Sequence, residues 1–320
     1  MNQQARPDNP LHAKDIEHFL KFGYVKLENC FDVSPGSLAS RWRTRTWLRC
    51  GYDPADPRTW TEEKIHFNRV NNVDLTTFAP VVAAAINQLL GGHAIANDPL
   101  CWGDGLIVNY RLGAEAPWIP PGPDAHDWHK DGDFFLHFLD SPEQALLTVV
   151  LWDDVVERGG PTYIATDSIA HVARFLAAHP GGVCPAEGDP ERDGLPSDIA
   201  RYDFPSIIRE CRDFRQVTGR AGDVYLMHPF MLHTASQNVL KQPRFVSNPA
   251  VSLRDPMNFH RPDSAYSPVE QAVLNSLGVS HLDFTPTTLR RRIEGGAERV
   301  RKATELERLA TARADAKATP

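Results

Sequence analysis

The stretch Trp128-His129-Lys130-Asp131-Gly132-Asp133-Phe134 carries the most informative pattern in the sequence. Residues two apart on an extended strand point to the same face, so the imidazole of His129 and the carboxylate of Asp131 can converge on one point. Such a pair supplies two ligands of a 2-His-1-carboxylate triad, which holds Fe(II) and leaves coordination positions open. Asp133 is the rival carboxylate, but its longer spacing from His129 breaks this strand geometry. Because a His-x-Asp pair is short enough to arise by chance, the hypothesis requires a second histidine elsewhere.

Further histidines follow far downstream, in the stretch Gly222-Asp223-Val224-Tyr225-Leu226-Met227-His228-Pro229-Phe230-Met231-Leu232-His233. A turn here feeds a strand, and a sheet that folds back on itself can bring such a strand to the first pair. His228 and His233 are therefore both candidates for the third ligand. Arg244 follows at the next predicted strand, and its forked, permanently charged guanidinium suits a carboxylate.

The composition limits the classes of function. The chain has 320 residues and 42% hydrophobic content, which is ample for a sizeable core. A net charge of -7, from 34 basic and 41 acidic residues, favours neither nucleic acid nor an anionic membrane surface as a partner. Five scattered cysteines form no Cys-x-x-Cys pair, which argues against structural zinc and a disulfide framework and favours a reducing, cytoplasmic setting. The polar N-terminus and the lack of a long apolar run predict neither a signal peptide nor a membrane segment.

The predicted elements favour a mainly β protein with flanking helices. Helical periodicity occurs at 13–22, 37–49, 79–90 and 169–178. Short strands separated by Gly/Pro turns are predicted at 105–112, 146–152, 161–165, 214–217, 223–228 and 245–253. This order indicates an antiparallel sandwich or jelly roll, whose mouth can hold a ligand.

We expect one domain across 1–320. Its N-terminal part, 12–100, adds helices and strands to a barrel core at 101–255, and 256–320 forms a mostly helical extension. The apolar spacing of Val300, Ala303, Leu306 and Leu309 would let that extension pack on the barrel or mediate a homodimer. Residues 180–200 form a polar Pro/Gly loop that could act as a lid.

Several short motifs occur together in one order. They are Phe19-Leu20-Lys21-Phe22-Gly23-Tyr24-Val25, His129-Lys130-Asp131, Trp152-Asp153-Asp154-Val155, Gly159-Gly160, Gly222-Asp223, and the block from His228-Pro229 through His233 and Asn238 to Arg244. In this order and spacing, over roughly residues 12–253, the chain resembles the phytanoyl-CoA dioxygenase family of Fe(II)/2-oxoglutarate-dependent oxygenases. The resemblance implies a double-stranded β-helix, a cupin-like jelly roll, with iron at one end.

The resemblance also implies roles for particular residues. His129, Asp131 and His233 would bind Fe(II), because the second histidine of the family's His-Pro-x-x-x-His pattern is the ligand. Arg244 would pair with the far carboxylate of the cosubstrate 2-oxoglutarate, and His228 would be a packed histidine or lie behind the ligands. The implied reaction consumes O2, converts 2-oxoglutarate to succinate and CO2, and hydroxylates or otherwise oxidises an organic substrate.

The sequence departs from the family pattern at the cosubstrate site. Families of this type often have a serine two residues after the distal histidine, where this chain has Ala235. The usual Pro-Gly-Ser-His is replaced by Thr166-Asp167-Ser168-Ile169. Contacts to 2-oxoglutarate would then come from elsewhere, and Thr148, Thr162 and Asn109 are candidates by position. Each of the three is equally compatible with an ordinary polar residue of a strand.

The substrate is the least determined part of this hypothesis. We favour a small free molecule, such as one of secondary metabolism. An acyl-CoA would need a basic groove for its phosphates, which the cluster Arg41–Arg49 could provide. A jelly-roll binding protein without activity is an alternative, although the intact ligand set argues against it. A cupin-like metal hydrolase or isomerase is another, but there Arg244 would have no cosubstrate to bind.

Overall fold

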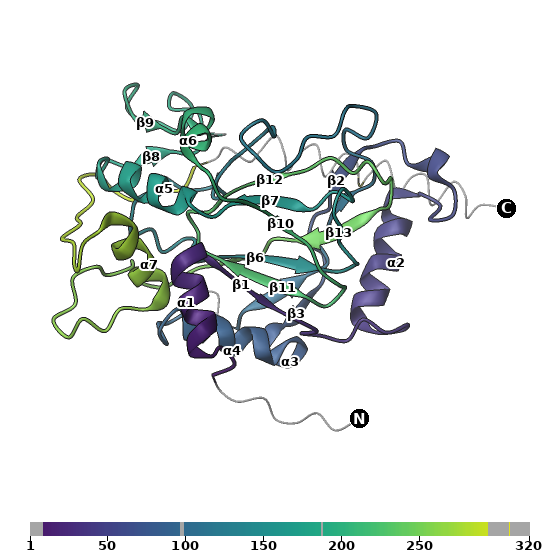
Figure 1. Ribbon diagram of the computed structural model, residues 1–320, viewed down its shortest axis with the longest axis horizontal. Helices are drawn as coiled ribbons and strands as arrows, with labels where there is room; N and C mark the ends of the chain where they lie inside the picture. The colour runs from purple at the N-terminus through teal and green to yellow at the C-terminus, as the bar shows by residue number, and fades with distance from the viewer. Residues whose placement is uncertain (1–8, 97–98, 187, 294–306, 308–320) are drawn as a thin grey trace.

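The computed structural model describes residues 9–96, 99–186, 188–293 and 307, and its centre is a pair of antiparallel sheets (Figure 1). The larger sheet has the order β1 (Tyr24–Leu27), β11 (Val224–Met227), β6 (Leu146–Leu151), β13 (Arg244–Ser247), β5 (Ile107–Asn109) and β2 (Lys64–His66), with β14 (Ala250–Val251) also pairing with β6. The smaller sheet has the order β10 (Phe214–Val217), β7 (Thr162–Ala165) and β12 (Leu232–Ala235).

The chain passes repeatedly between the two sheets. After β6 in the larger sheet come β7 and β10 in the smaller one, then β11 in the larger, β12 in the smaller and β13 in the larger. This alternation winds both sheets from one continuous region, which is the jelly-roll arrangement. The fold class expected from the sequence is therefore confirmed.

The segment around His129 extends the smaller sheet. His129 and His233 form an isolated antiparallel bridge, with His129 N donating to His233 O at 3.1 Å and His233 N donating to His129 O at 3.0 Å. Reciprocal bonds of this kind mark residues that lie directly opposite each other. The His-x-Asp segment is thus held against β12 by its main chain.

Helices cover the outside of the larger sheet. Figure 1 shows α1 (Ala13–Phe22), α3 (Leu75–Phe78) and α4 (Pro80–Leu89) on the side of β1 and β11 that faces away from β7, β10 and β12. This cover explains why every residue of β6 and β11 is buried. A strand buried on both faces is continuously apolar rather than alternating.

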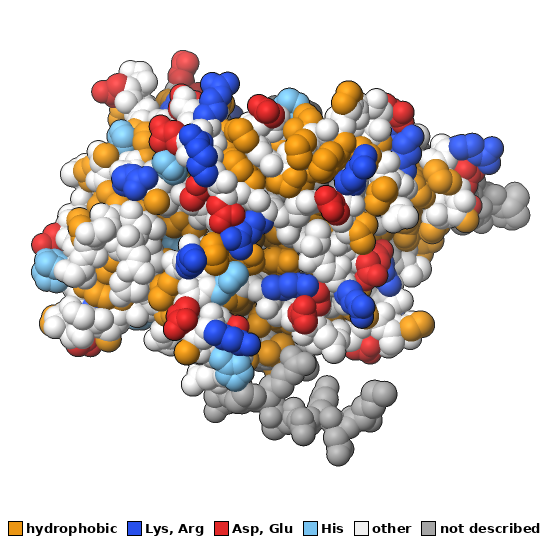
Figure 2. All heavy atoms as spheres, in the orientation of Figure 1, with side chains coloured by type: hydrophobic (Ala, Val, Ile, Leu, Met, Phe, Trp, Pro, Cys, Tyr) orange, Lys and Arg blue, Asp and Glu red, His pale blue; other side chains and the backbone are white. Residues whose placement is uncertain are grey.

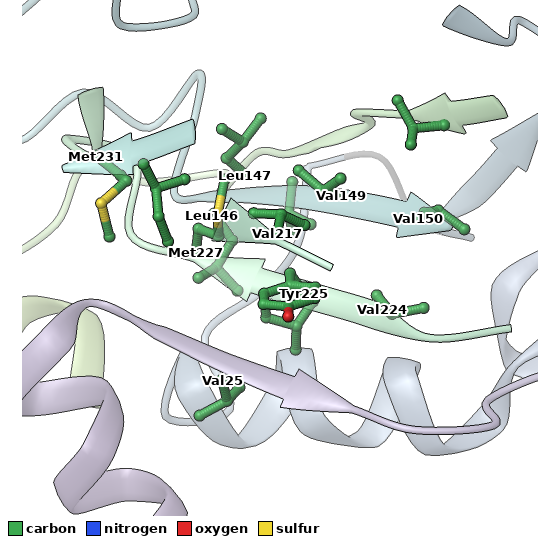
Figure 3. Packing of buried hydrophobic residues seen from close by; sticks show 14 of the residues in the cluster. Val25, Leu146, Leu147, Val149, Val150, Val217, Val224, Tyr225, Met227 and Met231 are labelled. Carbon is green, nitrogen blue, oxygen red and sulfur yellow. The ribbon is translucent and has the colours of Figure 1, made fainter. Parts of the chain in front are cut away.

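The packing of these strands is seen in Figure 3, where Leu147 and Val149 of β6 lie near Val217 of β10.

α1 ends as the sequence predicts, at Gly23. The φ of Gly23 is 73°, and its N–H donates to Phe19 O at 2.7 Å, which together form a left-handed C-cap. The next residue begins β1. Helix, cap and edge strand are therefore specified by adjacent residues.

The remaining elements lie around the barrel. They are α2 (Leu38–Cys50), a 3-10 turn at Pro57–Thr59, β3 (Asn72–Asp74), β4 (Cys101–Gly103), α5 (Ser168–Ala177), β8 (Val183–Cys184), β9 (Ala200–Arg201), α6 (Phe204–Glu210) and α7 (Pro268–Leu277). Several strands are shorter than predicted: the expected strand 105–112 is β5 alone, and 245–253 is divided into β13 and β14.

The C-terminal region is described only in part. Between 256 and 293, α7 is the helix present, and the rest of that range has no regular helix. The predicted helical spacing at Val300, Ala303, Leu306 and Leu309 lies outside the described residues.

The surface carries charges of both signs. Figure 2 shows Lys and Arg side chains interspersed with Asp and Glu over the face in view. Among the described residues, no helix is both long and apolar enough to cross a bilayer.

Candidate metal centre and cosubstrate cavity

Three side chains converge where the His-x-Asp segment meets β12. Oδ1 of Asp131 lies 3.5 Å from Nε2 of His129 and 3.4 Å from Nε2 of His233. The possible ligand atoms of these three residues all lie within 4.8 Å of one another, and in the described part of the chain they form the one such group of His, Cys, Asp or Glu. The main-chain bridge between His129 and His233 causes this convergence, because it sets the two imidazoles side by side.

The hydrogen bonds behind the imidazoles fix which nitrogen faces the site. Nδ1 of His129 lies 2.7 Å from the carbonyl oxygen of Asp127, and Nδ1 of His233 lies 3.1 Å from that of Met231. A carbonyl only accepts, so both Nδ1 atoms carry the proton and both Nε2 lone pairs point inward. Two neutral imidazoles and one carboxylate are the donor set that suits Fe(II), so the residues present fit this ion.

The three groups are coupled electrostatically. Burial would raise the pKa of Asp131, but the neighbouring imidazoles, first His233 and then His129, hold that pKa well below its ordinary value. Burial would lower the pKa of His129, yet the nearby carboxylate of Asp131 raises that pKa overall. Asp131 is therefore a carboxylate throughout the physiological range, as a metal ligand must be.

A cavity of about 610 Å³ opens beside these residues, and its walls come from both sheets. β13 contributes Arg244 and Val246, and Asn248 follows on the same period-two face. Val149 of β6 and Thr162 of β7 line the cavity as well. The volume falls within the range of about 300–1,000 Å³ typical of small-molecule sites.

Arg244 is the buried cation of this cavity. Its Nε donates to Gly160 O at 2.7 Å, and burial lowers the pKa of its guanidinium to about 10, which leaves it protonated at neutral pH. No carboxylate in the described ranges lies within ion-pair distance of Arg244. A buried positive charge without a nearby negative charge is unfavourable, so an anionic ligand at this position would stabilise Arg244.

The structure places the three candidate cosubstrate residues differently. Thr162 lines the cavity and lies opposite Ala235 in the β7–β12 register. The hydroxyl of Thr148 instead donates to Pro249 O, and its neighbour Val149 faces the cavity. Asn109 is also outside the cavity lining: its amide donates to Ser236 O at 3.0 Å, and its Oδ1 accepts from Leu112 N at 2.9 Å.

The rival ligands lie elsewhere. His228 is fully buried beside the rings of Phe19 and Phe230, and its Nδ1 accepts from Phe230 N at 3.1 Å. Burial lowers the pKa of His228 to about 3, so it is a neutral packed imidazole. Asp133 lines the cavity but is not in the converging group.

No protein-family model and no curated protein matches the sequence. Solved structures do match. The non-heme alpha ketoglutarate dependent carbocyclase SnoK from nogalamycin biosynthesis has 14% identity over 88% of this chain and 96% of its own, with a TM-score of 0.42. The epimerase SnoN from the same biosynthesis has 18% identity over 75% and 82%, with a TM-score of 0.37. HygX from Streptomyces hygroscopicus, with nickel, 2-oxoglutarate and hygromycin B bound, has 10% identity over 76% and 88%, with a TM-score of 0.39.

SnoK and SnoN are described as non-heme, alpha ketoglutarate dependent enzymes, and HygX was solved with 2-oxoglutarate bound. The likeness is distant and carries no argument about substrate or activity, which depend on the residues of the site itself.

Sequence reasoning missed several residues of the cavity. Ala186 lines it from the region 180–200 that was predicted as a loop and possible lid, and Phe204 lines it from the first position of α6. Asn248 also lines it, and its Nδ2 donates to Oδ2 of Asp131 at 2.9 Å. The period-two spacing 244, 246, 248 is the sequence signal that would have identified Asn248.

Proposed function

We propose that this protein is an Fe(II)- and 2-oxoglutarate-dependent oxygenase that oxidises a small organic molecule and releases succinate and CO2. His129, Asp131 and His233 would hold the iron, and Arg244 would bind the far carboxylate of 2-oxoglutarate. The observation that carries the proposal is the buried, carboxylate-free guanidinium of Arg244 in the same cavity as the converging triad.

This pairing of features separates the proposal from its alternatives. A metal hydrolase or isomerase would need the triad but would leave Arg244 buried without an anion, which is energetically unfavourable. A binding protein that had lost the reaction would have no need to hold both imidazoles in the tautomer that suits a metal. An oxygenase that uses a dicarboxylate cosubstrate requires both features at once.

Iron, when bound, would supply the open coordination positions at which 2-oxoglutarate and O2 react. The chain's own residues bind and orient the reactants. Asp127 O and Met231 O hold the ligand imidazoles, and Arg244, which is buried, neutralises the distal carboxylate from a position where such a pair is strengthened. Thr162, opposite Ala235, would provide the hydroxyl contact that the alanine lacks.

The cavity supports a small substrate rather than an acyl-CoA. The basic residues of α2 that could have received CoA phosphates do not line the cavity. Arg43 pairs with Asp153 at 3.0 Å, Arg45 lies 3.8 Å from Asp104, and Arg49 pairs with Glu307. These cations are therefore engaged with the protein's own acidic groups.

The experiment is an anaerobic titration of the purified protein with Fe(II) and then 2-oxoglutarate. Chelation of 2-oxoglutarate by triad-bound iron would give a weak metal-to-ligand charge-transfer band in the visible spectrum. We expect that band in the wild type and its loss in His233→Ala, with His228→Ala as the matched control that keeps it. Iron binding without the band would exclude the cosubstrate role and favour the hydrolase or binding-protein alternatives. If the band appears, succinate release can identify the substrate from a panel of small molecules.

A further inference from the structure

Asn248 lies beside the candidate metal centre because β13 and β14, the strands on either side of it, both pair with β6. Val246 and Ser247 of β13 pair with Leu151 and Val150, and Ala250 and Val251 of β14 pair with Leu147 and Leu146. Both pairings follow one continuous register, which sets Asn248 opposite Val149 and Pro249 opposite Thr148. Proline has no N–H for the ladder, and it favours an extended conformation in the residue before it. The ladder is thus interrupted at Asn248-Pro249 without a change of register.

Thr148 holds this interruption in place. Its backbone N–H donates to Pro249 O at 3.3 Å, and its hydroxyl donates to the same oxygen. Thr148 and Pro249 lie opposite each other on the face of the sheet that points away from the cavity. The next pair along the strands, Val149 and Asn248, therefore faces the cavity. The threonine that the sequence suggested as a cosubstrate contact therefore anchors the extended segment that carries Asn248.

The hydrogen bond from Asn248 gives the two carboxylate oxygens of Asp131 different surroundings. The amide Nδ2 donates to Oδ2 at 2.9 Å, whereas Oδ1 faces both ligand imidazoles. One oxygen is therefore occupied by an amide hydrogen and the other is directed at the metal position. A carboxylate held in this way offers a metal one oxygen and cannot rotate freely to offer both.

We propose that Asn248 is a positioning residue that keeps Asp131 a one-oxygen ligand, so that the coordination positions needed by 2-oxoglutarate and O2 stay open. This inference rests on the proposed function, because it assigns a role toward the iron of that site. β13 and the residue after it then present two functions on one face, the cosubstrate anchor Arg244 and the carboxylate positioner Asn248. Removal of a residue that hydrogen-bonds to a metal ligand commonly weakens metal binding by about 10- to 100-fold.

The test compares Asn248→Leu, Asn248→Gln and the wild-type protein. Leucine has nearly the shape of asparagine and lacks the donor, whereas glutamine retains a donor on a longer side chain. Asn275→Leu is the matched control, because Asn275 is also exposed and its amide oxygen accepts a side-chain hydrogen bond at 2.8 Å, but it lies on α7. The readouts are the affinities for Mn(II) and Co(II), the visible spectrum of the Co(II) protein, and the melting temperature.

We expect Asn248→Leu to weaken Mn(II) and Co(II) binding about tenfold. This is the smaller end of the range for residues that hydrogen-bond to a metal ligand, because Asn248 is exposed. We also expect a changed Co(II) spectrum with an unchanged melting temperature, and partial recovery of both metal readouts in Asn248→Gln. Wild-type affinity and spectrum in Asn248→Leu would overturn the inference while leaving the proposed function standing. Absence of metal binding by the wild type would instead overturn the proposed function, and the inference with it.

Discussion

Nε of Arg244 donates to the carbonyl oxygen of Gly160 at 2.7 Å, and this contact holds a guanidinium that is only 2% exposed inside the barrel. Gly160 has a φ of 78°, and a Cβ there would lie 2.6 Å from the Asn109 amide. A glycine therefore permits the close approach of the two sheets that brings the carbonyl to Arg244. One of the five N–H donors of the guanidinium is used in this way, and the cavity supplies the space for an acceptor.

Removal of this charge should stabilise the protein and abolish cosubstrate binding together. Arg244→Met replaces a desolvated, unpaired cation with an apolar side chain, so we expect the free energy of unfolding to rise by about 1–4 kcal/mol without ligand. In the wild type, 2-oxoglutarate should raise the melting temperature of the metal-loaded protein, since a ligand that binds only the folded state stabilises it. Arg244→Met should lose that increase, whereas Arg43→Met on α2 should retain it. An equal increase in Arg244→Met would contradict the cosubstrate role.

The two threonines considered from the sequence should have separable effects. Thr162→Val should weaken 2-oxoglutarate binding about three- to tenfold, the value of one hydrogen bond, and leave metal affinity unchanged. Thr148→Val should weaken metal affinity instead, because it releases the segment between β13 and β14 that carries Asn248. Titration of each variant with Mn(II) and then 2-oxoglutarate distinguishes them. The reverse assignment of effects would show that the sheet faces are misassigned.

A buried histidine links the turn after Asp131 to the segment that covers the cavity. Nε2 of His137 lies 2.8 Å from Gly132 O, and its Nδ1 lies 2.9 Å from the hydroxyl of Tyr202. Burial, together with repulsion from Lys130, holds the pKa of His137 well below its ordinary value, so the neutral ring donates to Gly132 and accepts from Tyr202. The ring of Tyr202 also stacks on Phe204 of the cavity wall, with centroids 4.8 Å apart.

Tyr202→Phe should therefore loosen this link. It leaves a buried acceptor unsatisfied, and we expect a loss of about 1–2 kcal/mol in the free energy of unfolding. Amide hydrogen exchange should also accelerate in residues 183–204 and around Gly132. Tyr225→Phe is the control, since it removes a tyrosine hydrogen bond to Thr218 O elsewhere in the barrel. Equal exchange in both variants at these residues would exclude the link.

Glu270 should make stability depend on pH near the C-terminal helix. Burial would raise its pKa, but hydrogen bonds from Arg261, Asn258 N and Ser267 N lower it below the ordinary value of 4.5. Such a group contributes stability above its unfolded pKa, and the contribution is lost as the pH falls through the folded pKa. Glu270→Gln should cost about 2 kcal/mol at pH 7, with a difference from wild type that shrinks below pH 4.5. A difference that stays constant down to acid unfolding would contradict this account.

The first helix shows how far local signals reach. The predicted range 13–22 agrees with α1, because amphipathic spacing and the C-cap glycine are both local. Strand ends were less predictable: β5 occupies only Ile107–Asn109 of the expected 105–112. A strand ends where its neighbours stop pairing, and this is a property of the sheet.

The choice between histidines depended on pairing as well. His228 and His233 are both histidines in the same turn-and-strand stretch, and the residues alone left both open. In the fold, His228 follows β11 of the larger sheet and packs against Phe19, whereas His233 lies on β12, directly opposite His129. The bridge between His129 and His233 brings those two imidazoles together with Asp131.

The sequence by itself determined the first helix and the jelly-roll class, since each follows from the periods and turns of short segments. It also predicted the candidate metal ligands and, through the family resemblance, the role proposed for Arg244. Tertiary structure decided which polar strand residues face the cavity. β6 is apolar along both faces, so its sequence has no alternation from which the side of Thr148 could be inferred. Pairing with the segment Asn248-Pro249 directs Thr148 away from the cavity and Asn248 toward it, because strand register sets the face of every residue in a sheet.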